Sequence, residues 1–373
     1  MTPFDYQPRT RVIFGPGRLS GVGEAARQLG GKRVLVVSDP DIVAAGYPRR
    51  AMKILEEAGL EALLFSDLEH DPSTRHVEAG LAFAREQRVD LLVGLGGGSS
   101  MDCAKGINFL LTNGGKMADY WGVGKARKPM LPFIAVPTTA GTGSEAQSFA
   151  LIADEVTHQK MAYGDPKAAA AVAILDPELT LTQPASVTAV TAIDAVSHAL
   201  ETWVTLKRNP VSQLFSQEAW RRLSANFERV LRSPEDIEAR GQMLLGAHFA
   251  GAAIENSMLG AAHACANPLT AHYGVVHGSA VGLMLPAVIR FNNEAVGNLY
   301  NELAVSSNGA VGLAERVDSM LEAAGVARRA SQYDVPESAL PGLAEEASRQ
   351  WTASFNPRPV GVKELLEIYQ RAY

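Results

Sequence analysis

Cysteines, long apolar runs and targeting signals are all scarce in this sequence of 373 residues. Its two cysteines, Cys103 and Cys265, lie far apart and form no CxxC pair, which argues against a disulfide framework or a thiolate metal site. We therefore expect a reducing, cytoplasmic compartment. No run of about 18 apolar residues appears, and the N-terminus lacks the apolar stretch of a signal peptide, so we expect no membrane span.

An excess of basic charge is also absent. The formal net charge is -6 and no block of like charge stands out, so nucleic acid is not expected as a partner. Apolar residues make up 47% and charged residues 20%, which is ordinary for a globular protein. A chain of this length suits two domains, each large enough to bury its own core.

The first half of the chain alternates short apolar strands with helical patterns. The expected strands are residues 34–37, 60–65, 90–95, 133–136 and 172–175, and the expected helices are residues 48–58, 72–87 and 99–111. This alternation predicts βαβ units and a parallel sheet with both faces covered. A hairpin is expected over residues 148–163.

The second half shows almost only helical periodicity. Helices are expected over residues 187–203, 213–231, 235–250 and 364–371, with Pro210, Pro234, Pro268, Pro286, Pro336 and Pro341 as starts or stops. We therefore predict an α/β domain over residues 1–182 and an all-helical domain over residues 183–373. A cleft between two such domains is the default place for a ligand.

A glycine-rich segment, residues 94–102, follows one expected strand and precedes a helix. Glycines let the backbone approach a bulky anion, and the helix start offers free N–H groups, so we predict a phosphate cradle. Ser99 and Ser100 are expected there as N-cap and hydroxyl donors. The spacing fits neither GxGxxG nor a P-loop, and a tight turn without a ligand is the alternative.

A second loop, residues 137–145, also follows a strand and is rich in threonine and glycine. Its hydroxyls and small residues suit the nicotinamide and ribose of a dinucleotide bound at the same sheet edge. Asp39 ends an earlier strand, where a carboxylate bonds ribose hydroxyls and repels a 2′-phosphate. That position favours NAD over NADP, although a helix-capping aspartate is the other interpretation.

Four residues in the helical half suggest a metal site. Asp194 and His198 are four apart in a helical pattern and so share one face. His263 and His277 would be roughly 21 Å apart on one helix, so the chain must turn back between them, and Gly274 is a suitable break. One aspartate and three histidines form a donor set that suits Fe²⁺ or Zn²⁺.

Three of the other histidines have different surroundings from these ligand candidates. His70, His76 and His158 lie in polar surroundings and are interpreted as surface residues, whereas His198, His263 and His277 lie among Ala, Gly and Val. An unpartnered imidazole is costly to bury, so the second group is better explained as ligands than as three separate core histidines.

These segments resemble the iron-containing (group III) alcohol dehydrogenases, from residues 14–17 to residues 356–359. The resemblance implies a dinucleotide-binding domain, a helical metal domain of the dehydroquinate synthase-like type, and a homodimer or larger homo-oligomer. It implies Asp194, His198, His263 and His277 as metal ligands and as the catalytic centre. The cofactor contacts that it implies are Asp39, Gly97, Gly98, Ser99, Asp102, Thr138, Thr139, Thr142 and Lys160.

The sequence departs from the family pattern at three places. Asn267 replaces a histidine that many members carry four residues after the third ligand, so that proton relay is missing or moved, with His272 as an untested substitute. Ile254 replaces a phenylalanine of the substrate pocket, which Phe149 is also expected to line. Asp71-Pro72-Ser73 replaces Asn-Pro-Thr, which puts an adenosine contact in doubt.

The resulting hypothesis is a reversible, NAD-linked oxidation of a small alcohol with one divalent metal, Fe²⁺ or Zn²⁺, as Lewis acid. A zinc-dependent glycerol or polyol dehydrogenase is the first alternative. A lyase resembling dehydroquinate synthase is the second, although more Lys and Arg would then be expected in the helical domain. A metal-binding scaffold without enzymatic activity is the third.

Overall fold

The computed structural model describes residues 3–69, 71–156, 160–304 and 309–373, which form two compact units. One unit is Gln7–Gln183, and the other is Pro184–Tyr373 together with the first residues of the chain up to Tyr6. This division differs from the predicted one at the N-terminus. The aromatic ring of Tyr6 lies 6.4 Å from that of Phe215, so apolar packing associates the start of the chain with the helical unit.

A parallel sheet forms the frame of the unit Gln7–Gln183. Its strand order is β1 (Arg11–Phe14), β9 (Val172–Leu175), β6 (Phe133–Pro137), β4 (Leu91–Gly96), β2 (Arg33–Val37), β3 (Glu61–Phe65). Every pairing in this sheet is parallel. The predicted strands are confirmed. Strand β1 was not predicted. Its apolar residues Val12 and Phe14 are exposed, so the segment lacks the alternation of buried and exposed residues that is typical of a strand.

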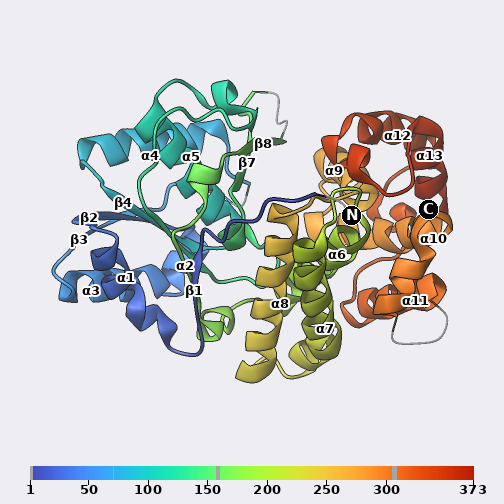
Figure 1. The fold of residues 1–373 in the computed structure, drawn as a ribbon, viewed down its shortest axis with the longest axis horizontal. Helices are drawn as coiled ribbons and strands as arrows, with labels where there is room; N and C mark the ends of the chain where they lie inside the picture. The colour runs from blue at the N-terminus through green and yellow to red at the C-terminus, as the bar shows by residue number, and fades with distance from the viewer. Residues whose placement is uncertain (1–2, 70, 157–159, 305–308) are drawn as a thin grey trace. The chain divides into compact units, whose positions relative to one another are not determined.

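Helices cover both faces of this sheet (Figure 1). Val34 and Val36 of β2 pack toward α1 (Val22–Gln28) and α3 (Tyr47–Glu57). Leu35 and Val37, on the opposite face, pack toward α4 (Thr74–Glu86) and α5 (Gly98–Asn113). Successive β2 side chains thus enter two different cores, which is why the strand reads as a continuous apolar run.

Shorter elements complete this unit. Helix α2 is Pro40–Ala44, and a small second sheet has the order β5 (Gly122–Val123), β8 (Lys160–Gly164), β7 (Phe149–Ala153). Strands β7 and β8 are antiparallel, which confirms the predicted hairpin, although residues 157–159 at its turn lie outside the described residues. The 3₁₀ turns are Arg18–Gly21, Met117–Tyr120, Ser144–Ala146, Pro166–Ala168 and Pro177–Thr180.

The second unit is helical throughout its described residues. Its helices are α6 (Ala185–Val204), α7 (Pro210–Arg232), α8 (Ile237–Glu255), α9 (Ala261–Tyr273), α10 (His277–Leu303), α11 (Gly309–Ala323), α12 (Leu340–Arg349) and α13 (Val362–Arg371). Its 3₁₀ turns are Ala330–Tyr333, Glu337–Ala339 and Trp351–Phe355. In the part of the chain that the structure describes, no helix has both the length and the apolar content to cross a membrane.

The predicted role of the prolines is wrong at two positions. Pro210 begins α7 as expected, but Pro268 and Pro286 lie inside α9 and α10. A proline inside a helix removes one hydrogen bond and costs about 3 kcal/mol. Pro268 and Pro286 are both buried, so packing of the surrounding helices offsets that cost.

The predicted chain reversal between His263 and His277 is confirmed. Gly274 ends α9 in the left-handed conformation at φ 63°, and α10 begins at His277. A glycine at this position takes up the positive φ without the steric cost of a side chain.

Candidate functional site

Helix α6 presents three polar side chains on one face. Asp194, His198 and Glu201 are spaced by four and three residues, so they lie one above another along the helix. All three are buried. Burying such groups without partners is costly, so their clustering in an otherwise apolar helix indicates a site.

Helices α9 and α10 bring two further histidines to this face. The Nε2 atoms of His198, His263 and His277 lie 3.3, 3.7 and 3.8 Å from Oδ1 of Asp194. The ligand atoms of Asp194, His263 and His277 all lie within 4.8 Å of one another. His198 is not in that group of three, but it approaches the same carboxylate oxygen and its ring stacks on His263 at 5.0 Å. The structure thus brings the four predicted ligands together.

The residues present fit a divalent cation. Oδ1 of Asp194 and Nε2 of His263 are buried, and neither makes a hydrogen bond to any described residue. Burial alone raises the pKa of the Asp194 carboxyl, but the surrounding histidines outweigh it and hold that pKa well below its usual range. Burial alone lowers the pKa of His263, but Glu201 and Asp194 raise it to about 9, so a bound cation would have to displace a proton from this ring. An anionic, buried oxygen and an unbonded ring nitrogen are what a cation needs.

Glu201 is a site residue that the sequence reasoning missed. Its Oε2 lies 2.5 Å from Nδ1 of His263, on the side of the ring away from Asp194. The signal was present, because Glu201 follows His198 by three residues on the same helical face.

The two glycine and threonine loops meet at the carboxyl ends of β4 and β6, which are neighbours in the sheet. A methyl group on Gly98 would lie 2.9 Å from Cγ2 of Thr142, and one on Gly97 would lie 3.5 Å from Cγ2 of Thr139. Glycine at position 98 is therefore required for the second loop to approach the start of α5. This close approach joins the two predicted cofactor loops at one edge.

The predicted N-cap of α5 is wrong. The helix begins at Gly98 with Gly97 as its N-cap, and no side chain caps it in the described structure, so Ser99 and Ser100 lie within the first turn. Ser100 is buried and donates its hydroxyl to Oδ2 of Asp39 at 2.9 Å. The first N–H groups of α5, which have no partner within the helix, are therefore not covered by a capping side chain.

Asp39 caps a helix, and its role toward a ribose stays a prediction. Its Oδ1 accepts a hydrogen bond from the N–H of Ile42, so Asp39 caps α2. This confirms the interpretation of Asp39 as a helix-capping residue. It also lies directly beyond β2, and Gly96 has φ 152°, where a side chain would meet Ser100 and Asp39. The carboxylate is thus held against the glycine-rich loop, residues 94–102.

A buried lysine that the sequence reasoning missed holds the second loop. Lys105 on α5 donates from Nζ to the carbonyl oxygens of Ser144, Gln147 and Phe149 at 2.7, 2.9 and 2.7 Å. Asp102, one turn earlier, accepts from the Ser144 hydroxyl at 2.6 Å. Burial raises the pKa of Asp102 despite the lysine beside it.

The other predicted cofactor residues lie on or near these loops. Thr138 follows β6, and its buried Oγ1 makes no hydrogen bond to a described residue. Thr139 is partly exposed. Lys160 begins β8 and is exposed, and its Nζ lies 2.9 Å from Oδ1 of Asp71, the residue that departs from the family pattern.

The predicted substrate-pocket residues have different surroundings. Ile254 is buried on α8, and the ring of Phe149 packs over Gly164. Asn267 lies one turn after His263 and donates to Gln350 at 3.0 Å. His272 is exposed and pairs with Glu346 at 2.8 Å, roughly 13 Å along α9 from His263. The structure does not support His272 as a substitute proton relay.

The prediction that His76 lies at the surface is wrong. Its imidazole is buried, and Nδ1 accepts from the N–H of Ser73 at 2.9 Å, so it caps the start of α4. His70 and His158 lie outside the described residues.

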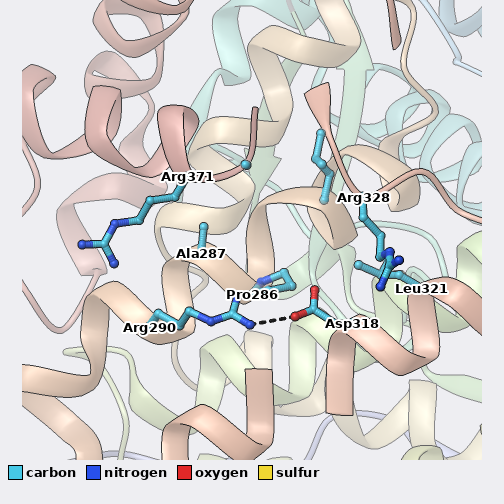
Figure 2. Close-up of a pocket in the computed structure, with 9 residues that line it drawn as sticks. Pro286, Ala287, Arg290, Asp318, Leu321, Arg328 and Arg371 are labelled. Atoms are coloured by element: carbon cyan, nitrogen blue, oxygen red, sulfur yellow. Dashed lines mark hydrogen bonds and ion pairs between the residues drawn. The ribbon is translucent and has the colours of Figure 1, made fainter. Parts of the chain in front are cut away.

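A separate hollow in the helical unit involves α10, α11 and the C-terminal residues (Figure 2). Its cationic side chains already face carboxylates: Arg290 pairs with Asp318 at 2.7 Å, and Arg371 pairs with Glu367 at 2.5 Å. We assign no ligand to this hollow.

Comparison with known proteins covers nearly the whole chain. Residues 8–177 match the model of the iron-containing alcohol dehydrogenases, and residues 188–373 match the C-terminal model of the same family. The NAD-dependent methanol dehydrogenase of Bacillus methanolicus is 34% identical over 100% of both chains.

Solved structures agree with the family models. A 1,3-propanediol oxidoreductase is 31% identical, with a TM-score of 0.95 over 100% of both chains. A sulfoacetaldehyde reductase from Bifidobacterium kashiwanohense in complex with NAD⁺ is 26% identical, with a TM-score of 0.92 over 100% of this chain and 99% of that one. The chain therefore belongs to the iron-containing alcohol dehydrogenase family.

Proposed function

We propose that this protein oxidises a small alcohol to the aldehyde with NAD⁺, reversibly, using one divalent metal ion held by Asp194, His198, His263 and His277. The observation that carries the proposal is the buried Oδ1 of Asp194, which three imidazole nitrogens approach within 3.8 Å. Iron is the metal that the family description names, and we propose Fe²⁺. A divalent ion bound there supplies Lewis-acid polarisation of the alcohol or carbonyl oxygen.

The remaining chemistry is positioning by the chain itself. The helix faces of α6 and α9 hold three of the proposed ligands in a buried, low-dielectric environment, where the carboxylate of Asp194 attracts a cation more strongly than in water. In the oxidation, hydride passes from the alcohol carbon to nicotinamide and the hydroxyl proton is released. The amide of Asn267 is not basic enough to accept this proton. We therefore propose that the proton reaches solvent without a relay residue at position 267.

For the cofactor we propose NAD with contacts from Gly97, Gly98, Ser99, Thr138, Thr139, Thr142 and Lys160. The uncapped start of α5 supports a bound pyrophosphate, because its N–H groups and dipole favour an anion. Asp39, which both Ser100 and Ile42 orient, supports NAD over NADP. Asp102 supports the same site by holding Ser144 of the second loop.

The proposed substrates are short alcohols and diols, the class that the names of the methanol and propanediol enzymes suggest. Ile254 and Phe149 remain the proposed side chains of the substrate pocket. Ile254→Phe and Ile254→Ala variants, assayed on alcohols of increasing chain length, separate a pocket residue from a core residue.

A homodimer and a cytoplasmic location complete the proposal. Strand β1 is an edge strand with Val12 and Phe14 exposed, and an unpaired edge favours association with another chain. Both cysteines are free and buried, which suits a reducing compartment. Light scattering of the purified protein tests the dimer.

The deciding experiment follows NADH formation over methanol, ethanol, 1,3-propanediol and glycerol, with apoprotein reconstituted by Fe²⁺ or Zn²⁺. We expect one metal ion per chain, activity that requires it, and little reaction with NADP⁺. Full activity in the presence of excess chelator, or no net NADH from any alcohol, would contradict the proposal.

A further inference from the structure

One carboxylate connects two helices of the proposed metal site without being a ligand itself. Oε1 of Glu201, on α6, accepts the N–H of Ala262 at 2.7 Å, and Oε2 lies 2.5 Å from Nδ1 of His263. Both partners are in the first turn of α9. Glu201 and His263 are both buried, so water does not compete for these bonds.

The two bonds have different consequences. The bond to Ala262 satisfies one N–H that α9 cannot satisfy internally, and so fixes where the helix starts. The bond to Nδ1 requires the proton of the neutral imidazole to lie on that nitrogen, because the carboxylate accepts rather than donates. Nε2 then carries the lone pair, and it is Nε2 that lies 3.7 Å from Oδ1 of Asp194.

We infer that Glu201 is the positioning residue that fixes the tautomer and ring orientation of His263 for metal binding. This inference rests on the proposed metal site. A partner of this kind on the far ring nitrogen typically changes metal affinity 10–100-fold, about the effect expected here.

The start of α9 is built around this carboxylate. A methyl group on Gly260 would lie 3.1 Å from Oε1 of Glu201 and 3.1 Å from Oδ1 of Asn356. Asn356 accepts the N–H of Ala261 at 3.3 Å and exchanges hydrogen bonds with Asn292. Asn356 therefore supports the same helix end as Glu201, while its bonds go to Ala261, Asn292 and Arg358 and not to His263, which makes it a matched control.

The test is Glu201→Gln beside Asn356→Ala. Glutamine has one oxygen and one amide group. If the oxygen keeps Ala262, the amide nitrogen faces Nδ1 and places the imidazole proton on Nε2, where it blocks the metal. We expect the Gln variant to bind Zn²⁺ and Co²⁺ on the order of 10–100-fold more weakly in a chelator competition, with an altered visible spectrum of bound Co²⁺. Asn356→Ala should lower the melting temperature of the apoprotein and leave the Co²⁺ spectrum unchanged.

The outcomes separate this inference from the proposed function. If the wild-type protein binds no metal, both are wrong. If the wild type binds one ion and Glu201→Gln binds it equally well, only the role of Glu201 is overturned. If Glu201→Gln does not fold, ¹⁵N-histidine NMR of the zinc-loaded wild type decides: a protected Nδ1 proton on His263 supports the inference, and a metal on Nδ1 overturns it.

Discussion

The two units build their candidate sites by different means. In the α/β unit, backbone groups and small residues of two loops meet because Gly98 permits close approach, and the buried Lys105 holds the second loop by hydrogen bonds to its carbonyl oxygens. In the helical unit, large polar side chains on α6, α9 and α10 converge on one carboxylate oxygen. A loop site is encoded by neighbouring residues, whereas a side-chain site depends on how distant helices pack.

The largest effect that tests this difference is expected from His263→Ala. Losing one ligand should remove the metal and lower turnover by about 10³-fold or more, because the Lewis acid contributes several kcal/mol. NAD⁺ affinity should change little, because His263 belongs to the helical unit. Elemental analysis and calorimetric titration with NAD⁺ measure the two properties separately.

His272→Ala is the matched control for that variant. His272 lies on the same helix, but it is exposed and paired with Glu346. Metal content and turnover should remain near wild type. An equal loss in both histidine variants would mean that α9 as a whole, rather than a ligand, had been disturbed.

The second prediction concerns Lys105, which supports the loop at residues 137–145. Lys105→Met removes a buried ammonium from three carbonyl oxygens and from the neighbourhood of Asp102, at 3.9 Å. Leaving such groups without a partner should cost on the order of 3–5 kcal/mol of unfolding free energy. NAD⁺ binding should weaken as well, while metal content should not change. Denaturant unfolding and NAD⁺ titration check this.

Lys167→Met provides the comparison for Lys105. Lys167 also pairs with an aspartate, Asp165 at 3.2 Å, but its side chain is 42% exposed. Its replacement should cost less than about 1 kcal/mol, because solvent screens the exposed ammonium and the buried Asp165 keeps its hydrogen bonds from the N–H groups of Ala126 and Lys167. Similar destabilisation by the two substitutions would show that burial is not the reason for the effect of Lys105.

Much of the fold and of the site could be predicted because the signals were local. The strands around the glycine loops, the helix that carries Asp194 and His198, and the break at Gly274 all follow from short-range patterns. The convergence of His263 and His277 on Asp194 depends on packing between helices that are distant in sequence. Only the family resemblance indicated it.

Lys105 and Glu201 were missed for one reason, which is that their buried polar groups are satisfied by residues distant in sequence. Lys105 bonds residues about forty positions away, and Glu201 bonds a residue 62 positions away. His76 was misplaced for a different reason: its polar neighbours suggested the surface, but it bonds Ser73, only three residues away, and is buried at the start of α4. Local composition does not reveal the partners of Lys105 and Glu201, because the fold supplies them.

The third prediction tests whether Gly98 is needed for the close approach of the two loops, residues 94–102 and 137–145. In Gly98→Ala the new methyl group would lie 2.9 Å from Cγ2 of Thr142, so the second loop must shift. Overpacking of this kind costs about 1–3 kcal/mol, which corresponds to roughly 5- to 150-fold in NAD⁺ affinity if the strain is borne by the bound state. Gly21→Ala, where no atom lies within 4 Å of the added methyl, should bind NAD⁺ normally. Equal affinity in both variants would contradict the proposed contact.

The smallest expected effect is a very slow reaction of the two buried cysteines with a thiol reagent. Each unit holds one cysteine, Cys103 on α5 and Cys265 on α9, and both are fully buried. Burial raises the pKa of Cys103 to about 12 and also raises that of Cys265, so neither thiolate forms readily near pH 8. The native protein should therefore react very slowly with a thiol reagent, and both thiols should react at once in denaturant.

The slow native reaction can distinguish the two units, because each thiol becomes reactive only when its own surroundings open. A ligand that binds the folded form suppresses such opening by mass action. With Cys103→Ser and Cys265→Ser variants, NAD⁺ should slow the reaction of Cys103 more than that of Cys265, and Zn²⁺ should do the opposite. If either ligand protected both thiols equally, the two units would open as one cooperative unit, and the assignment of an independent loop site and an independent side-chain site would be wrong.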